Sequence, residues 1–240
     1  MFIGHYGAAY AIKRWRPDIS IFTLFMAVQL LDVAWAVLVF AGVEKVRIVP
    51  DITETNSLDL YYMPYTHSLL AAVVWAMASG VTYKALHRAA LGAGIAIGLA
   101  VFSHWAFDFL VHRPDLPLYD NVKKVGLGWW NFPRFALLLE VGILLGGLVL
   151  YLRGTRGVGV LGSIGPWLFV IVLIAVQASV FFGRSISSPN QAAVIALVSY
   201  VVFALIAVWL DHHRRVLGNV TPGRPAPVLR GSGAAAAHRP

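Results

Sequence analysis

The sequence predicts an all-α fold, namely a polytopic membrane helix bundle with about six transmembrane helices and a short N-terminal half-span helix. Of the 240 residues, 59% are hydrophobic and only 12% are charged, whereas soluble domains carry about 25% charged residues. The charged residues also gather in short clusters between apolar runs. Most of these runs are long enough to cross a hydrocarbon core of about 30 Å as helices.

The apolar runs define the elements in chain order. Residues 1–12 form a helix of only about 18 Å, which is too short to span the bilayer. Longer runs follow, and we predict one transmembrane helix for each: residues 19–42, 66–82, 89–111, 135–152, 166–182 and 191–210. We predict one membrane domain over residues 1–215. Its candidate site lies within about residues 1–152, residues 166–210 add a helix pair, and a disordered tail rich in Gly, Pro and Ala covers residues 216–240.

Charge and cysteine content restrict the partners and ligands. The net charge is +8, but the basic residues flank the apolar runs, so topology and anionic lipid explain them better than nucleic acid does. The positive-inside rule places these basic turns and the C-terminus in the cytoplasm of a multi-pass inner-membrane protein. The chain has no cysteine, so any bound metal must take imidazole and carboxylate ligands. The partner that we expect from this charge pattern is membrane lipid.

Three ionisable residues form a stripe at the end of the third predicted span. His104, Asp108 and His112 are four residues apart, and each step of four drifts only about 40° around a helix, so the side chains share one face. Imidazole nitrogens and carboxylate oxygens are ligands of divalent metals. Ionisable groups at membrane depth are costly and usually mark a site. The simpler alternative to a metal site is a helix end whose His-Asp pair faces water.

Other spans place ionisable residues at the same depth as this stripe. At about 1.5 Å per residue from the basic turn of each span, Asp32, His67, His104 and Glu140 lie about 20 to 25 Å up, and His5 lies about 16 Å up. An unpaired carboxylate there costs on the order of 3 kcal/mol. Shared cations would neutralise the carboxylates, and imidazoles supply further ligands without added charge. We therefore predict one metal-holding layer.

The predicted layer favours phosphoester hydrolysis. It offers enough ligands for two metal ions, or for three, and paired ions suit the cleavage of phosphate esters because they activate water and hold the phosphoryl oxygens. Arg113 and Arg134 flank the loop above the site and could clamp a phosphate, although interfacial anchoring explains them equally well. The expected cofactor is a divalent metal, with zinc as the first choice.

The order of the motifs resembles the bacterial membrane-bound metal-dependent hydrolase family, which is grouped with zinc phospholipases C and related zinc nucleases. The resemblance covers roughly the first 140 residues, and the last two spans add nothing to it. It depends on four pieces in order: Gly4-His5, Asp32, Thr66-His67-Ser68 and Ser103-His104-Trp105-Ala106-Phe107-Asp108.

The resemblance implies a role for each candidate residue. Asp32, His67, His104 and Asp108 would hold a first metal, Asp108 and His5 a second, and His112 and Glu140 a third. We predict that Asp32 and Asp108 are the catalytic carboxylates. The sequence departs from the secreted enzymes in two ways. It has Ala136 where they carry a second His one turn before the Glu. They present a processed N-terminal amine close to the early His, whereas here Met1 lies only four residues before His5.

Two other classes of function use the same residue types. A proton- or ion-coupled transporter would use buried Asp, Glu and His as a relay. A bis-His haem protein would use His67 and His104 as axial ligands, although the clustered carboxylates argue against it.

Overall fold

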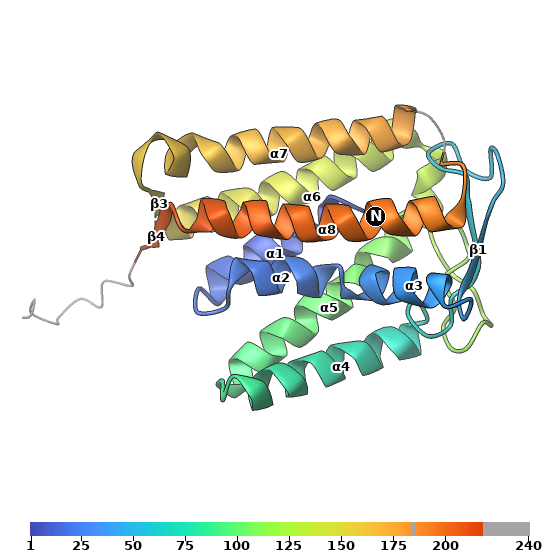
Figure 1. Ribbon diagram of the computed structural model, residues 1–240, viewed down its shortest axis with the longest axis horizontal. Helices are drawn as coiled ribbons and strands as arrows, with labels where there is room; N and C mark the ends of the chain where they lie inside the picture. Colours follow the sequence, from blue (N-terminus) through green and yellow to red (C-terminus); the bar gives the residue numbers. More distant parts are fainter. Residues whose placement is uncertain (184–185, 218–240) are drawn as a thin grey trace, which may run out of the picture.

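The computed structural model describes residues 1–183 and 186–217, and these residues form a helical bundle (Figure 1). The predicted fold class is confirmed. The helices, in chain order, are α1 (Gly4–Trp15), α2 (Ile21–Val28), α3 (Leu30–Phe40), α4 (Leu69–Leu86), α5 (Leu91–Val111), α6 (Pro133–Gly154), α7 (Gly159–Phe182) and α8 (Pro189–Asp211), with a short 3₁₀ helix η1 (Trp129–Asn131).

Five helices, α4 to α8, are each long and apolar enough to cross a membrane, and α2 with α3 forms a sixth candidate span. The span predicted over residues 19–42 is this pair, and it is broken rather than one continuous helix. α2 and α3 are bent by 56° at Gln29. The Gln29 side chain donates a hydrogen bond to the Phe2 carbonyl at 3.2 Å, so a partner from the N-terminal segment stabilises the break.

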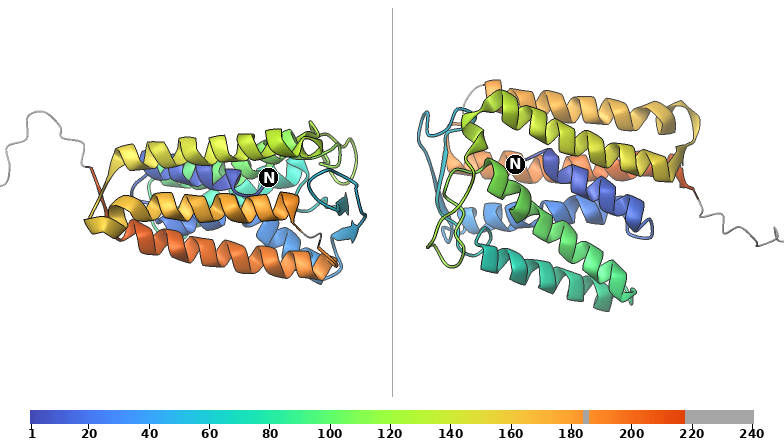
Figure 2. Two further views of the ribbon diagram at one scale, coloured as in Figure 1. Left: turned by 90° about the horizontal axis from the view of Figure 1, so that it is seen from above. Right: turned by 180° about the vertical axis from the view of Figure 1, so that it is seen from behind.

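Small two-stranded sheets and loops close the ends of the bundle. β1 (Lys45–Ile48) pairs antiparallel with β2 (Leu58–Tyr62), and β3 (Thr155–Gly157) pairs with β4 (Arg214–Val216). Figures 1 and 2 show β1 and β2 at one end and β3 and β4 at the other. The predicted tail begins at residue 216, which belongs to β4, and residues 218–240 lie outside the described part of the chain.

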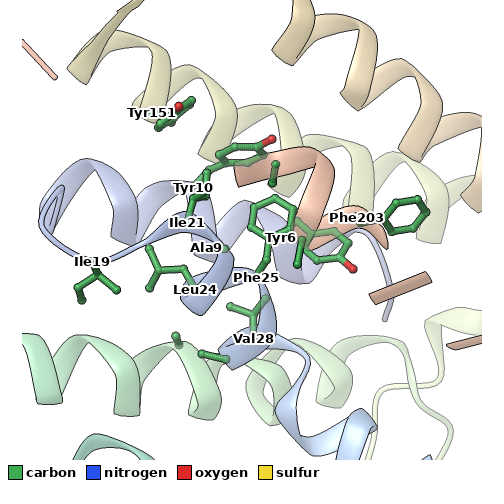
Figure 3. Close-up of a cluster of buried hydrophobic side chains, with 14 of the residues drawn as sticks. Tyr6, Ala9, Tyr10, Ile19, Ile21, Leu24, Phe25, Val28, Tyr151 and Phe203 are labelled. Carbon is green, nitrogen blue, oxygen red and sulfur yellow. The ribbon is translucent and has the colours of Figure 1, made fainter. Parts of the chain in front are cut away.

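The apolar core lies where α1, α2 and α8 meet. Tyr6 stacks on Phe25 with ring centroids 4.5 Å apart, and Phe203 meets Tyr6 edge-on at 6.2 Å. These side chains come from three helices, and α8 is distant in sequence from the consecutive helices α1 and α2 (Figure 3). Because α1 is buried in this core, the N-terminal half-span helix is an integral part of the bundle rather than a surface segment.

A close approach of two glycines seats α1 against α6. A Cβ atom built on Gly147 would lie 2.0 Å from the carbonyl oxygen of Gly7, and one built on Gly7 would lie 2.3 Å from that of Ile143. Small residues permit such backbone contact between membrane helices. The contact carries the first turn of α1, with His5, towards the middle of the bundle, where the chain start is marked in Figure 1.

Candidate metal centre

Asp108 is the hub of the buried polar cluster. It lies on α5 with its side chain 2% exposed. Its Oδ2 atom is 3.1 Å from His104 Nε2, 3.7 Å from His67 Nε2 and 3.6 Å from His112 Nε2. Its Oδ1 atom faces the other way, 3.3 Å from His5 Nε2 and in contact with the α-amino group of Met1. The two carboxylate oxygens therefore serve two sides of one cluster.

Asp32 brings a second carboxylate to the Oδ2 side of the cluster. His67 Nε2 and His104 Nε2 lie 3.2 and 3.5 Å from Asp32 Oδ1, and they lie 3.7 and 3.1 Å from Asp108 Oδ2. Ligands about 2.0–2.1 Å from one tetrahedral zinc ion lie about 3.4 Å from each other. Asp32, His67 and His104 form one group whose ligand atoms could hold an ion, and Asp108 faces both imidazoles of that group. These four residues are the ones that the resemblance assigns to the first metal.

His5 and His104 belong to a second group with Asp108. Ligand atoms of these three buried residues lie within 4.8 Å of one another, as do those of Asp32, His67 and His104. The two rings stack with centroids 3.9 Å apart. Within residues 1–183 and 186–217, both nitrogens of His5 and Nε2 of His104 are buried without a hydrogen-bond partner. Buried polar atoms rarely remain unpartnered, so these nitrogens fit ligands of a bound cation.

The break between α2 and α3 fixes the orientation of His104. The Val28 carbonyl lies at this break and accepts a hydrogen bond from His104 Nδ1 at 2.7 Å. A carbonyl can only accept, so Nδ1 carries the proton and, in the neutral ring, Nε2 keeps its lone pair. Irregular backbone at membrane depth needs such a partner. The bend therefore exposes a carbonyl that directs a lone pair of His104 towards the carboxylates.

Glu44 and Thr66 orient His67 in the same way. The Thr66 hydroxyl donates to Glu44 Oε2 at 2.6 Å and lies 2.7 Å from His67 Nδ1. Since its own hydrogen is given to Glu44, the hydroxyl accepts from Nδ1–H, which leaves Nε2 free to face Asp32. Outer partners of this kind fix the tautomer and direction of metal-binding histidines. Glu44 is 1% exposed, and sequence reasoning missed it because it lies among other acids in a polar loop.

His112 corrects the prediction that the stripe lies entirely on one helix. α5 ends at Val111, and His112 is its extended C-cap residue. Its ring still lies at the cluster. Nδ1 is 2.9 Å from Asp115 Oδ1, and the ring packs against that of Trp130 with centroids 4.1 Å apart. A carboxylate accepts from Nδ1–H, so Nε2 again faces Asp108.

Glu140 lies on α6 and holds the start of the chain. Its Oε2 atom accepts hydrogen bonds from the backbone N–H groups of Phe2 and Gly4 at 2.8 and 3.2 Å, and Gln177 on α7 lies 3.4 Å from Oε1. No hydrogen bond or ion pair joins Glu140 to His112 among the described residues. The third metal implied by the resemblance stays a prediction.

Tyr200 is a further cluster residue that sequence reasoning missed. Its hydroxyl donates to Asp32 Oδ2 at 2.6 Å and leaves Oδ1 facing the histidines. Tyr200 lies on α8, and Gln177 lies on α7. The last two spans therefore contact the candidate site.

Of the two arginines of the predicted phosphate clamp, Arg113 adjoins the cluster through Asp115. The Arg113 guanidinium pairs with Asp59 and, at 3.2 Å, with Asp115 Oδ2, so its charge is already partly balanced. Arg134 is exposed near the start of α6. Neither lines the cavity that reaches the cluster. The substrate-binding role of both arginines stays a prediction.

Comparison of the chain with known protein families, with curated proteins and with solved structures found no match. The family resemblance therefore stays a prediction. The structure shows a helical protein with five or six candidate membrane spans and buried His/Asp groups that could hold metal.

Proposed function

We propose that this protein is a membrane-embedded, metal-dependent hydrolase that cleaves a phosphoester with a di- or trinuclear site. One observation carries the proposal. His67, His104 and His112 each give their Nδ1 hydrogen to an acceptor, so each directs Nε2 at Asp108, and the first two also at Asp32. Lone pairs that face carboxylates in a buried site repel each other unless a cation lies between them.

The residues present fit zinc-type ions. Asp32, His67, His104 and Asp108 would hold one ion, and His5 with Asp108 a second, all through the imidazole and carboxylate groups that such ions accept. Bound in pairs, these ions make water acidic enough to attack at neutral pH and stabilise charge on phosphoryl oxygens.

The chain's own groups hold this arrangement in place. Glu44 fixes the His67 imidazole by way of the Thr66 hydroxyl. The Val28 carbonyl fixes the imidazole of His104, and Asp115 fixes that of His112. The Tyr200 hydroxyl fixes Asp32. Because these groups are already oriented before substrate binds, little reorganisation is needed during the reaction. Burial of Asp108 and His104 excludes bulk water from the cluster and strengthens each electrostatic contact.

The geometry favours bound cations over a proton relay. In a transporter, protonated imidazoles would donate hydrogen bonds from Nε2 to the carboxylates. The Nε2 atoms of His5 and His104 have no hydrogen-bond partner, although carboxylate oxygens lie within 3.5 Å. Their positions suit ligands around a shared centre.

Hydrolysis of bis(p-nitrophenyl) phosphate by the purified full chain in detergent tests the proposal. We expect zinc-supported turnover that falls on the order of 10²–10³-fold with a chelator, because the charge on the phosphoryl oxygens loses its stabilisation. Turnover should return when zinc is added back. The opposite result is an absence of hydrolysis together with ion-driven uptake into vesicles that depends on Asp32 and Glu140, which would favour the transporter.

A further inference from the structure

A cavity of about 200 Å³ opens onto the candidate metal centre. Asp32, His67, Asp108 and His112 form its polar part. The remaining lining is almost entirely apolar and comes mainly from α3, α7, α8 and the loops near β2. These lining residues include Trp35, Leu60, Met63, Trp130, Val176 and Val180. The cavity thus joins a polar, metal-capable end to apolar walls.

α8 lines the cavity with one continuous face. Ala192, Ile195, Ala196, Ser199 and Tyr200 all contact it, and their spacing of three and four residues places them on one side of a helix. Val176 and Val180 add one face of α7 in the same way. Figures 1 and 2 show α8 alongside α3 and α7. Small alanines on α8 leave room that larger side chains would fill.

Beyond the cluster, the described walls carry few polar groups, chiefly the Trp35 indole N–H and the Ser199 and Tyr200 hydroxyls. Among residues 1–183 and 186–217, no lysine or arginine side chain lines the cavity, and the Tyr200 hydroxyl is already bound to Asp32. The lining helices α7 and α8 are also candidate membrane spans. Apolar walls favour an apolar occupant through the removal of its surface from water, and a bilayer supplies such molecules laterally.

We propose that the cavity binds the apolar chain of an amphiphilic phosphoester drawn from the bilayer, with the phosphate at the His/Asp cluster. The α7–α8 pair therefore determines substrate specificity through the length and width of the chain it accepts. This inference rests on the proposed function and specifies its substrate class. It assigns a role to two spans that hold none of the predicted metal ligands.

Alkylphosphonates of increasing chain length, from ethylphosphonate to dodecylphosphonate, test the assignment with zinc-loaded protein. Binding is measured by calorimetry and by inhibition of bis(p-nitrophenyl) phosphate hydrolysis. In the wild type we expect affinity to rise up to about fourfold per added methylene until the cavity is filled. In Ala196→Trp the rise should be lost while ethylphosphonate binds as before.

Matched variants make the outcome specific. Val180→Trp fills the same cavity from α7 and should behave like Ala196→Trp, so the test survives if one variant does not fold. Val198→Trp places the same side chain on the exposed face of α8 and should keep the chain-length dependence. Equal affinity for short and long chains in the wild type, or an unchanged rise in both cavity variants, would overturn the assignment. A failure of ethylphosphonate itself to bind would instead count against the proposed function.

Discussion

Asp108→Asn is expected to remove the bound metal and to lower phosphoester hydrolysis by at least about 10³-fold. Asp108 contributes both carboxylate oxygens to the cluster, one facing His67, His104 and His112 and the other facing His5. The amide keeps the size of the side chain but loses its charge and one acceptor. Loss of outer partners alone typically costs 10–100-fold in metal affinity or activity, so loss of a shared ligand should cost more. Elemental analysis of the purified variant gives the metal content per chain.

Asp211→Asn is the matched control for this substitution. Asp211 is also a partly buried carboxylate, but it pairs with Lys13 and Tyr151 near β3 and β4, away from the cluster. The control should keep the wild-type metal content and hydrolysis rate. Equal metal content in Asp108→Asn and the wild type would show that the cluster is not the binding site.

Chelation is expected to destabilise the wild-type protein, with loss of several degrees in the midpoint of thermal unfolding in detergent. Without metal ions, the half-buried Asp32 and buried Asp108 carboxylates remain close to the Nε2 lone pairs. An ion that binds only the folded state stabilises it by about 2.7 kcal/mol at 100 times its Kd and by about 4.1 kcal/mol at 1,000 times. Removing the ion removes that stabilisation. Scanning with and without a chelator, followed by zinc, measures it.

Asp108→Asn separates this effect from a general effect of the chelator. Because the variant should bind no metal, its midpoint should be the same with and without chelator. If the wild-type midpoint is equally insensitive, the buried carboxylates are not stabilised by metal ions, and the proposed function loses its physical basis.

Hydropathy was sufficient to predict the bundle of helices but not the bend between α2 and α3. The long apolar runs require helices because backbone groups in a bilayer must bond within their own segment. The run over residues 19–42 met the same criterion, yet it divides at Gln29. The division depends on contacts from elsewhere in the chain, namely Phe2 to Gln29 and His104 to Val28. Local periodicity contains no information about such partners.

Helix periodicity and the depth of each residue in its span were enough to predict part of the candidate site. The spacing of His104 and Asp108 placed them on one face, and rise per residue placed Asp32 and His67 at their level. Periodicity could not show that His112 approaches Asp108 from beyond the helix end.

The supporting residues left weaker signals in the sequence. Glu44 is one of several acids in a loop, and Tyr200 is an aromatic residue in an apolar span, so neither differs from its neighbours in composition. Gln177 is a polar residue within an apolar helix and was the available signal that α7 reaches the site. Only the packing of the helices brings these side chains to the cluster.

Anomalous diffraction from zinc-loaded crystals of the full chain tests whether the His/Asp cluster binds metal. We expect a peak among Asp32 Oδ1, His67 Nε2, His104 Nε2 and Asp108 Oδ2, with a second peak on the side of Asp108 Oδ1 and His5. A map without a peak among those four atoms would show that the cluster is not a metal centre.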